Sequence, residues 1–376
     1  MSLHVVQVNC PIDAERRDPE ALLAAWPTLA AIATATQRAG ATVTVLQASH
    51  APAEYRRDDV TYRFVPEPRL RRGSGAGILP WRLAAAVRRE APDVVHFNGL
   101  DFPFHARAIC DLGVPVLMQD HSSRVEERIG RFRRWGHGKV RAAAFTSRAQ
   151  AEPFVRSGHL PRDIPVVAIP ESSSDFTPGD RDEARRETGV FGAPALLWVG
   201  HLDLRKDPLT ILKAVRKALD VLPNLQLWCA FIGTDLLPEV EALLRQDEVL
   251  AAHVHLLGRA PHHRVQVLCR ACDIFVSASR REGSGYALLE ALACGATPVV
   301  TDIPAFRALT EDRVGSLVPT GDADAFAAAI ILAVRQLHQG SRARIVRHFK
   351  RNLAFDVVGA RLVQAYAALA RTAVPT

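Results

Sequence analysis

The sequence predicts an α/β protein of two domains, each organised around a parallel β-sheet. At 376 residues the chain is longer than one hydrophobic core usually serves, since domains of about 100 to 200 residues are typical. Short apolar runs alternate with longer helical patterns in both halves, which is the pattern of strand–helix–strand units. The composition, 48% hydrophobic and 23% charged, excludes a disordered chain.

The first apolar runs are expected to form the sheet of the N-terminal domain. Helix-like stretches such as 21–39 and 83–90 separate these runs, so a helix follows a strand and the sheet is expected to be parallel. The five predicted strands are 5–8, 43–46, 94–97, 114–118 and 166–169.

Polar turn formers interrupt this alternation between Pro170 and Asp180. They show no periodicity, which is typical of a linker between domains. We therefore assign 1–172 to an N-terminal domain and 173–192 to the linker.

The alternation restarts after the linker, in a C-terminal domain assigned to 193–350. The stretch 353–371 is amphipathic and rich in alanine, so residues 351–376 are expected to form a helix that packs on the body of the protein. The predicted strands of the second sheet are 195–199, 225–232, 253–257, 274–277 and 297–300.

Positive charge is concentrated in the N-terminal half. The formal charge is +7, the pI is near 9.4, and arginines cluster in 69–89 and 124–141. This excess would suit an anionic acceptor or an anionic membrane surface, or serve solubility alone. The segment 124–135 interleaves basic with aromatic residues, as a peripheral membrane contact requires, although its mixed charge favours a solvated face. We expect no nucleic-acid partner, because no recognised binding motif accompanies the arginines.

The compartment is predicted from three features of the chain. Its first residues resemble a β-strand and lack the basic-then-apolar layout of a signal peptide. No window approaches the roughly 18 uninterrupted apolar residues that a membrane span needs. The six cysteines lie mostly in apolar segments, where a free thiol behaves as a small hydrophobic group. We expect a cytoplasmic protein without disulfides, and peripheral binding to the inner face of the membrane is the further expectation from its basic segments.

A glycine followed by basic residues stands where the predicted strand 195–199 ends and a helix is expected. From Gly200 to Lys206 the sequence reads Gly-His-Leu-Asp-Leu-Arg-Lys. Such a loop can receive a phosphate on helix N–H groups while the lysine supplies a positive charge. Taken alone, the motif is explained equally well by a turn with solvated charges.

A second loop, from Glu282 to Ala287, reads Glu-Gly-Ser-Gly-Tyr-Ala and precedes another predicted helix. Its glycines at 283 and 285 let the backbone approach a ligand closely, and the N–H groups of 284–287 would point outward from the start of the helix. The sequence therefore predicts a cradle for a diphosphate or a sugar.

Glu290 lies in the first turns of that helix, where its carboxylate could accept hydrogen bonds from two vicinal hydroxyls of a ribose. Glu282, on the loop, would lie nearer the sugar than the nucleoside. Two solvated acids are the ordinary alternative. Glu290, however, lies in the otherwise apolar segment 286–293, where an unpaired buried charge would be costly.

These motifs resemble those of the retaining glycosyltransferases of family 4, which have the GT-B architecture of two facing Rossmann-like domains. The resemblance covers most of the C-terminal half closely and the N-terminal half loosely. It implies that a Rossmann-like domain at 1–172 binds the acceptor and that a second one at 193–350 binds the nucleotide sugar. In that family a Gly-Arg-Leu…Lys element binds the donor diphosphate. An acid, seven residues and a second acid contact the donor sugar and its ribose. The matching positions are Gly200-His201-Leu202…Lys206 and Glu282…Glu290.

The resemblance also implies roles for individual residues. His121, at the end of predicted strand 114–118, is implied to contact the donor sugar near the reacting carbon, although a lone histidine is more often structural. The implied catalytic residues are His121, Lys206 and Glu282, and Asn9 and Cys10 are expected to border the acceptor. The implied donor-binding residues are Gly200, His201, Arg205, Lys206, Gly258, Arg259, Glu282, Gly283, Ser284, Gly285, Tyr286, Ala287 and Glu290.

Two positions depart from the family pattern. His201 stands where the family has arginine, and Ser284 stands where an aromatic residue is common. An imidazole lacks the guanidinium fork, so binding of the diphosphate is expected to be weaker or to be shared with Arg205.

The expected activity is transfer of a sugar from a nucleoside diphosphate, UDP or GDP, to a hydroxyl of an unidentified and anionic acceptor. No cofactor and no metal are expected. Asp322-Ala323-Asp324 is better explained as a helix cap than as a metal motif. Cys269 and Cys272 lack the second ligand pair of a zinc site. The alternatives are another GT-B enzyme, such as an epimerase, and a noncatalytic subunit that binds nucleotide sugars.

Overall fold

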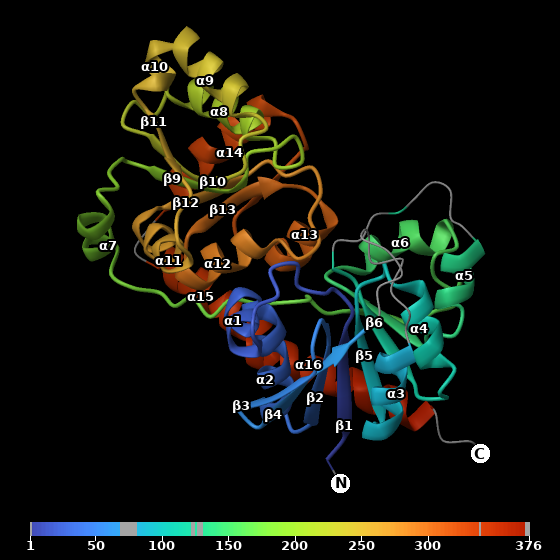
Figure 1. Ribbon diagram of the computed structural model, residues 1–376. Coiled ribbons are helices and arrows are strands. Elements are labelled where there is room, and N and C mark those ends of the chain that lie inside the picture. The colour runs from blue at the N-terminus through green and yellow to red at the C-terminus, as the bar shows by residue number, and fades with distance from the viewer. Residues whose placement is uncertain (1, 68–80, 122–124, 126–130, 338–339, 373–376) are drawn as a thin grey trace. The chain divides into compact units, whose positions relative to one another are not determined.

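The computed structural model describes residues 2–67, 81–121, 125, 131–337 and 340–372 (Figure 1). The chain forms two compact units. The N-terminal unit comprises Met1–Ser173 and Phe355–Thr376, and the C-terminal unit comprises Ser174–Ala354. Parts of both arginine-rich segments, 69–80 within the first and residues 124 and 126–130 within the second, lie outside the described residues.

The N-terminal unit contains a sheet of eight strands in the order β3-β4-β2-β1-β5-β6-β7-β8. Only β3 is antiparallel to its neighbour, and the other pairs are parallel. All five strands predicted for this half are present, and β3, β4 and β7 were not predicted. The strands are β1 (His4–Asn9), β2 (Thr42–Ser49), β3 (Ala53–Arg57), β4 (Val60–Pro66), β5 (Val94–Asn98), β6 (Val116–Gln119), β7 (Ala142–Phe145) and β8 (Val166–Ala168).

Helices cover both faces of this sheet. Figure 1 shows α2 and α16 on one face and α3 and α4 on the other. The predicted helix at 21–39 is divided at Trp26, because Pro27 begins a second helix whose first turn needs no N–H donor. The helices are α1 (Pro19–Ala25), α2 (Pro27–Arg38), α3 (Trp81–Glu90), α4 (Pro103–Cys110), α5 (Arg131–His137), α6 (Arg148–Arg156) and α16 (Phe355–Thr372).

Helix α16 joins the last part of the chain to the N-terminal unit. Val358, Leu362, Tyr366 and Leu369 recur every three or four residues and are buried against α2 and the sheet. The hydroxyl of Tyr366 lies 2.5 Å from Nδ1 of His96 on β5. In the described part of the chain, one helical stretch, Ser341–Arg371, has the length and composition to cross a membrane, a test that core helices of globular proteins also pass.

The C-terminal unit contains a wholly parallel sheet in the order β11-β10-β9-β12-β13-β14. The five predicted strands are present, and the short β14 was not predicted. From β9 the chain builds outward through β10 and β11, then returns to place β12 on the other side of β9. The strands are β9 (Ala195–His201), β10 (Gln226–Ile232), β11 (Val254–Gly258), β12 (Ile274–Ser277), β13 (Thr297–Thr301) and β14 (Ser316–Val318).

Helices also cover both faces of the second sheet. Figure 1 shows α8 and α14 on one face and α11, α12 and α15 on the other. Asp322 accepts a hydrogen bond from the N–H of Ala325, which confirms the predicted cap of α14. The helices are α7 (Arg181–Thr188), α8 (Pro208–Ala218), α9 (Leu237–Gln246), α10 (Glu248–Ala251), α11 (His262–Ala271), α12 (Tyr286–Cys294), α13 (Pro304–Thr310), α14 (Ala323–Gln336) and α15 (Ser341–Asn352).

The segment expected as a linker, 173–192, contains helix α7. This helix packs on α11 within the C-terminal unit. Arg185 of α7 donates to Asp273 at 2.8 Å, and Asp273 precedes β12. The residues 170–180, where the sequence pattern breaks, contain no helix or strand.

Candidate functional site

The loops that follow β9 and β12 lie side by side at the carboxyl edge of the second sheet. These two strands are neighbours, and the chain leaves them in opposite directions, so their loops flank the position where ligands bind in open α/β sheets. The first loop carries the predicted residues Gly200–Lys206, and the second carries Glu282–Ala287.

Two cations face one carboxylate where these loops meet. The ammonium of Lys206 donates to Oε1 of Glu282 at 2.5 Å, and a guanidinium nitrogen of Arg205 lies 3.6 Å from Oε2. The side chains of Lys206 and Glu282 are 14% and 8% exposed, so their attraction is screened less than that of a surface pair. The structure thus brings together three residues that the sequence predicted.

Asp207 and Arg280 join the same two loops. Asp207 has a left-handed backbone, with φ 45°, and its Oδ1 accepts from the N–H of Thr210 to cap α8. Its Oδ2 accepts from Arg280 at 2.7 Å. The N–H of Arg280 in turn donates to the carbonyl of Arg205 at 2.8 Å. Neither residue was predicted for the site, although an aspartate followed by proline at a helix start indicates an N-cap.

Glycine occupies two positions of the site for different structural reasons. Gly285 is left-handed, with φ 67°, and a Cβ there would lie 3.0 Å from Leu309 and 3.1 Å from Phe306. It precedes α12 without a side-chain cap, so the first N–H groups of the helix have no side-chain acceptor there. A Cβ on Gly200 would lie 3.4 Å from the stem of Lys206. Glycine therefore allows the close packing of both loops, and the uncapped start of α12 presents N–H groups that an anion can accept from.

Glu290 of α12 is a buried carboxylate with a single side-chain donor. It is 4% exposed, and its Oε1 lies 2.7 Å from Nε2 of His262. Burial raises the pKa of Glu290, and the hydrogen bond from His262 opposes that rise. The same hydrogen bond raises the pKa of His262. His262 was not among the residues predicted for the site, and its pairing with Glu290 was not predicted.

The remaining predicted residues of this unit lie around the same edge. Gly258 ends β11 with a left-handed backbone, φ 65°, beside a register shift in β10, and Arg259 is exposed. His201 ends β9 and is exposed. Because α11 begins only three residues after Arg259, the loop after β11 reaches α12 through His262.

In the N-terminal unit, His121 follows β6 and has an acceptor at each ring nitrogen. Its Nδ1 lies 2.8 Å from Oε2 of Glu171, and its Nε2 lies 2.8 Å from Oδ1 of Asn98. Burial lowers the pKa of His121, but the hydrogen bond and charge of Glu171 and the charge of Asp120 outweigh it, so the pKa is raised. The carboxylate of Glu171 therefore stabilises the charged form of the His121 ring.

A cavity of about 160 Å³ adjoins His121 in the N-terminal unit. Carboxamides from three adjacent strands line it, and Nδ2 of Asn9 is buried without a hydrogen-bond partner in the part of the chain that the structure describes. Cys10 instead packs in the apolar core, and burial raises its pKa well above the ordinary thiol value. The carboxamides are Gln7, Asn9, Gln47 and Asn98.

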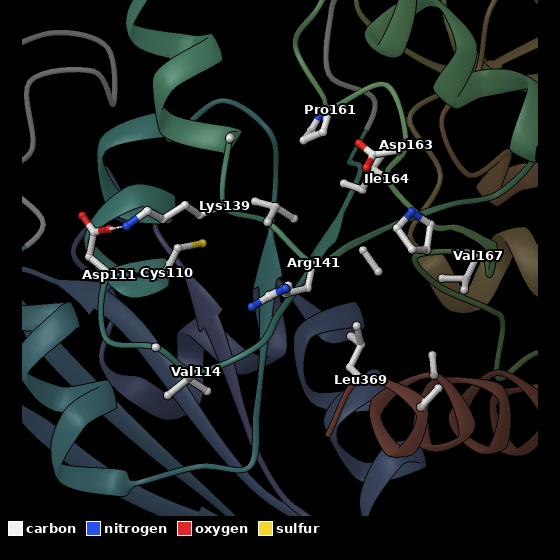
Figure 2. A pocket seen from close by; sticks show the side chains of 17 residues that line it. Cys110, Asp111, Val114, Lys139, Arg141, Pro161, Asp163, Ile164, Val167 and Leu369 are labelled. Atoms are coloured by element: carbon white, nitrogen blue, oxygen red, sulfur yellow. Dashed lines mark hydrogen bonds and ion pairs between the residues drawn. The ribbon is translucent and has the colours of Figure 1, made fainter. Parts of the chain in front are cut away.

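A cavity of about 930 Å³ lies at the opposite edge of the same sheet, before β6, β7 and β8. Figure 2 shows Lys139 and Asp111 at one side of this cavity and Leu369 of α16 at the other. The ammonium of Lys139 donates to Oδ1 of Asp111 at 2.6 Å. None of the predicted site residues lines this cavity.

Two family models match the chain on either side of residues 171–179. The model described as glycosyl transferases group 1 matches 180–349, and the model described as glycosyltransferase family 4 matches 28–170. The chain belongs to glycosyltransferase family 4. The family predicted from the two loops is thereby confirmed.

Curated relatives of this family 4 protein match part of its length. The D-inositol 3-phosphate glycosyltransferase of Geodermatophilus obscurus is 36% identical over 225 residues, which are 57% of this chain and 49% of that protein. The phosphatidyl-myo-inositol mannosyltransferase of Mycolicibacterium smegmatis is 31% identical over 176 residues, which are 46% and 44% of the two chains. The chain spans about half the length of these relatives.

Solved structures share the fold of this family 4 protein over nearly its whole length. Sucrose-phosphate synthase from Thermosynechococcus elongatus matches with a TM-score of 0.71 at 17% identity, covering 98% of this chain and all of the other. HepE from Anabaena, solved with UDP and glucose, matches with a TM-score of 0.68 at 16% identity and the same coverage. Likeness at this identity concerns the fold, and it confirms the predicted GT-B architecture.

Proposed function

We propose that this family 4 protein transfers a glycosyl unit from a nucleoside-diphosphate sugar to an acceptor hydroxyl, with retention at the anomeric carbon and without a metal. The observation that carries the proposal is the contact of Lys206 with Glu282 on the loop before the uncapped start of α12, with the buried Glu290 about one turn into the same helix. The cation and the free N–H groups are suited to a diphosphate. The two carboxylates are suited to the hydroxyls of a sugar and of a ribose.

In this proposal the C-terminal unit stabilises the leaving group. The bond between the anomeric carbon and the diphosphate oxygen breaks, and its electron pair leaves on the diphosphate. The acceptor oxygen forms the new bond to the anomeric carbon, and its proton passes to the departing diphosphate. Lys206, Arg205 and the first N–H groups of α12 would meet that charge, and such preorganised charges and dipoles are the largest contribution in many enzymes. Glu282 would hold a sugar hydroxyl, and no side chain needs to act as a covalent nucleophile.

His121 is the proposed contribution of the N-terminal unit to sugar binding. As an imidazolium held by Glu171, it would present a fixed positive charge and no basic nitrogen. We therefore propose that it orients the sugar and does not remove a proton.

We propose a polyhydroxylated ring as the acceptor. The names of the curated relatives specify inositol derivatives, and the four carboxamides beside His121 offer donors and acceptors in the N-terminal unit. The arginine-rich segments support a phosphate on that acceptor, and we propose a cytoplasmic enzyme that works beside the inner face of the membrane.

A thermal-shift panel tests the donor site. The wild type and Glu290→Ala are melted with UDP, GDP, ADP and TDP, because ligand at a hundredfold excess over its Kd adds about 2.7 kcal/mol of stability. Stabilisation by one diphosphate, lost in the variant, would support the site and name the base. Turnover of the matching sugar nucleotide with and without inositol then separates transfer from epimerisation. Binding without any turnover would favour a noncatalytic subunit, which is the function that His201 in place of arginine favours.

A further inference from the structure

Glu290 has one carboxylate oxygen engaged and one available. Oε1 lies 2.7 Å from Nε2 of His262, and Oε2 has no hydrogen bond from any residue in the described ranges. The side chain is 4% exposed, and its neighbours on α12 are apolar. Oε2 is not among the described side-chain atoms that are both fully buried and without a partner, so this oxygen is open to a donor from a ligand.

Aromatic rings fix the orientation of His262. Its ring centroid lies 4.6 Å from that of Phe176, and it is nearly parallel to the ring of Tyr286, with an interplanar angle of 16° and a centroid distance of 6.3 Å. His262 is the first residue of α11, so its backbone is fixed as well. Half of its side chain remains exposed, which leaves the edge of the pair open to solvent.

We infer that His262 is a positioning residue that holds Oε1 of Glu290 so that the carboxylate can accept both hydroxyls of a ribose. This inference rests on the donor site proposed above. A carboxylate offers about four lone-pair directions, and His262 occupies one on Oε1. The second lone pair of Oε1 and the lone pairs of Oε2 are then free to accept hydrogen bonds from a vicinal diol. Without His262 the carboxylate would be free to rotate, and its burial would favour the neutral acid, which accepts less well.

The experiment uses nucleotides that differ only in the ribose hydroxyls. The Kd values of UDP, GDP and ADP and of their 2′,3′-dideoxy counterparts are measured by calorimetry for the wild type, His262→Ala, His262→Gln and His263→Ala. The glutamine amide can donate to Oε1 from a similar place. His263 is the adjacent, exposed histidine and is the matched control.

We expect the wild type to bind one ribonucleotide more tightly than its dideoxy form. His262→Ala should raise the Kd of the ribonucleotide by about tenfold, since hydrogen bonds to charged groups contribute about 1.5 kcal/mol or more. The same variant should bind the dideoxy form as the wild type does. His262→Gln should restore most of the ribose preference, and His263→Ala should leave both values unchanged.

Equal weakening of the ribo and dideoxy forms in His262→Ala, or an unchanged ribose preference, would overturn the positioning role while leaving the donor site intact. Failure of the wild type to bind any of the nucleotides would overturn the proposed function, and this inference with it.

Discussion

The ammonium of Lys206 and the carboxylate of Glu282 lie 2.5 Å apart although 76 positions separate them in the chain. The contact joins the loops after β9 and β12, the strands at which the sheet changes direction. Each residue therefore neutralises the other before a donor enters. A diphosphate and a sugar would then replace one partner of each residue, so binding separates a preformed pair.

Lys206→Ala is expected to lower turnover of the sugar nucleotide by about 100-fold or more, because it removes a cation from the developing charge of the leaving group. Lys217→Ala is the control, since Lys217 is an exposed lysine paired with Asp324 on the surface. Steady-state rates for both variants test this. Near-wild-type turnover by Lys206→Ala and by Glu290→Ala would contradict the assignment of the donor site.

Nucleotide binding is expected to weaken as the pH falls through the pKa of Glu290. Burial raises that pKa, although His262 opposes the rise, so protonation begins at a higher pH than for an ordinary glutamate. The protonated acid loses acceptor capacity, and binding is therefore complete above this pKa and lost below it. Calorimetry between pH 5 and 8 measures the effect. Glu290→Gln should bind weakly with a flat profile, and a flat profile in the wild type would argue against the role of Glu290.

Glu171→Gln is expected to lower the pKa of His121. In the wild type the hydrogen bond and charge of Glu171 outweigh the effect of burial and raise that pKa. The His121–Glu171 pair makes its full contribution to the free energy of unfolding below the ordinary histidine pKa. This contribution is lost as the pH rises through the raised pKa of His121. NMR titration of the His121 ring in the two proteins gives the shift directly. An unchanged pKa would show that Glu171 does not hold the proton.

Asp207→Ala is expected to destabilise the protein by about 1 kcal/mol through loss of the cap on α8, and to raise the KM for the donor by freeing Arg280. Asp207→Asn keeps a capping oxygen and tolerates the left-handed backbone. It should therefore retain stability while still raising KM. Thermal melts and donor kinetics separate the two effects, and equal KM values in all three proteins would refute the contribution of this pair.

Gly359→Ala is expected to destabilise the N-terminal unit by about 1 to 3 kcal/mol through overpacking. The added Cβ would lie 2.3 Å from the carbonyl oxygen of Ala35, where α16 crosses α2. Ala360→Ser, at the next and exposed position, is the control. Chemical denaturation provides the comparison, and equal stability of the two variants would show that the helices separate without cost.

The sequence predicted ten strands because their apolar runs are longer or richer in branched residues than their surroundings. It missed β7, which consists of three alanines and a phenylalanine, since alanine is depleted in strands. It missed the β3–β4 hairpin because Asp58 and Asp59 make the turn, both with positive φ, without the glycine that usually marks it.

The site was predictable where one loop carries the whole motif, as at Gly200–Lys206 and Glu282–Ala287. It was not predictable where residues meet across loops. His262 and Glu290 are 28 positions apart, and His121 and Glu171 are 50 apart with two strands between them. Their pairing follows from strand order, which spacing along the chain does not encode.

Helix α16 has a consequence for the order in which the protein is completed during synthesis. The apolar face of α2 and the sheet stays open until Val358, Leu362 and Tyr366 have left the ribosome, because α16 supplies the side chains that cover it. The C-terminal unit is one continuous segment and ends before α16 begins. The C-terminal unit, although it is translated later, can thus complete its folding first. The N-terminal unit completes its folding only after α16 has been synthesised.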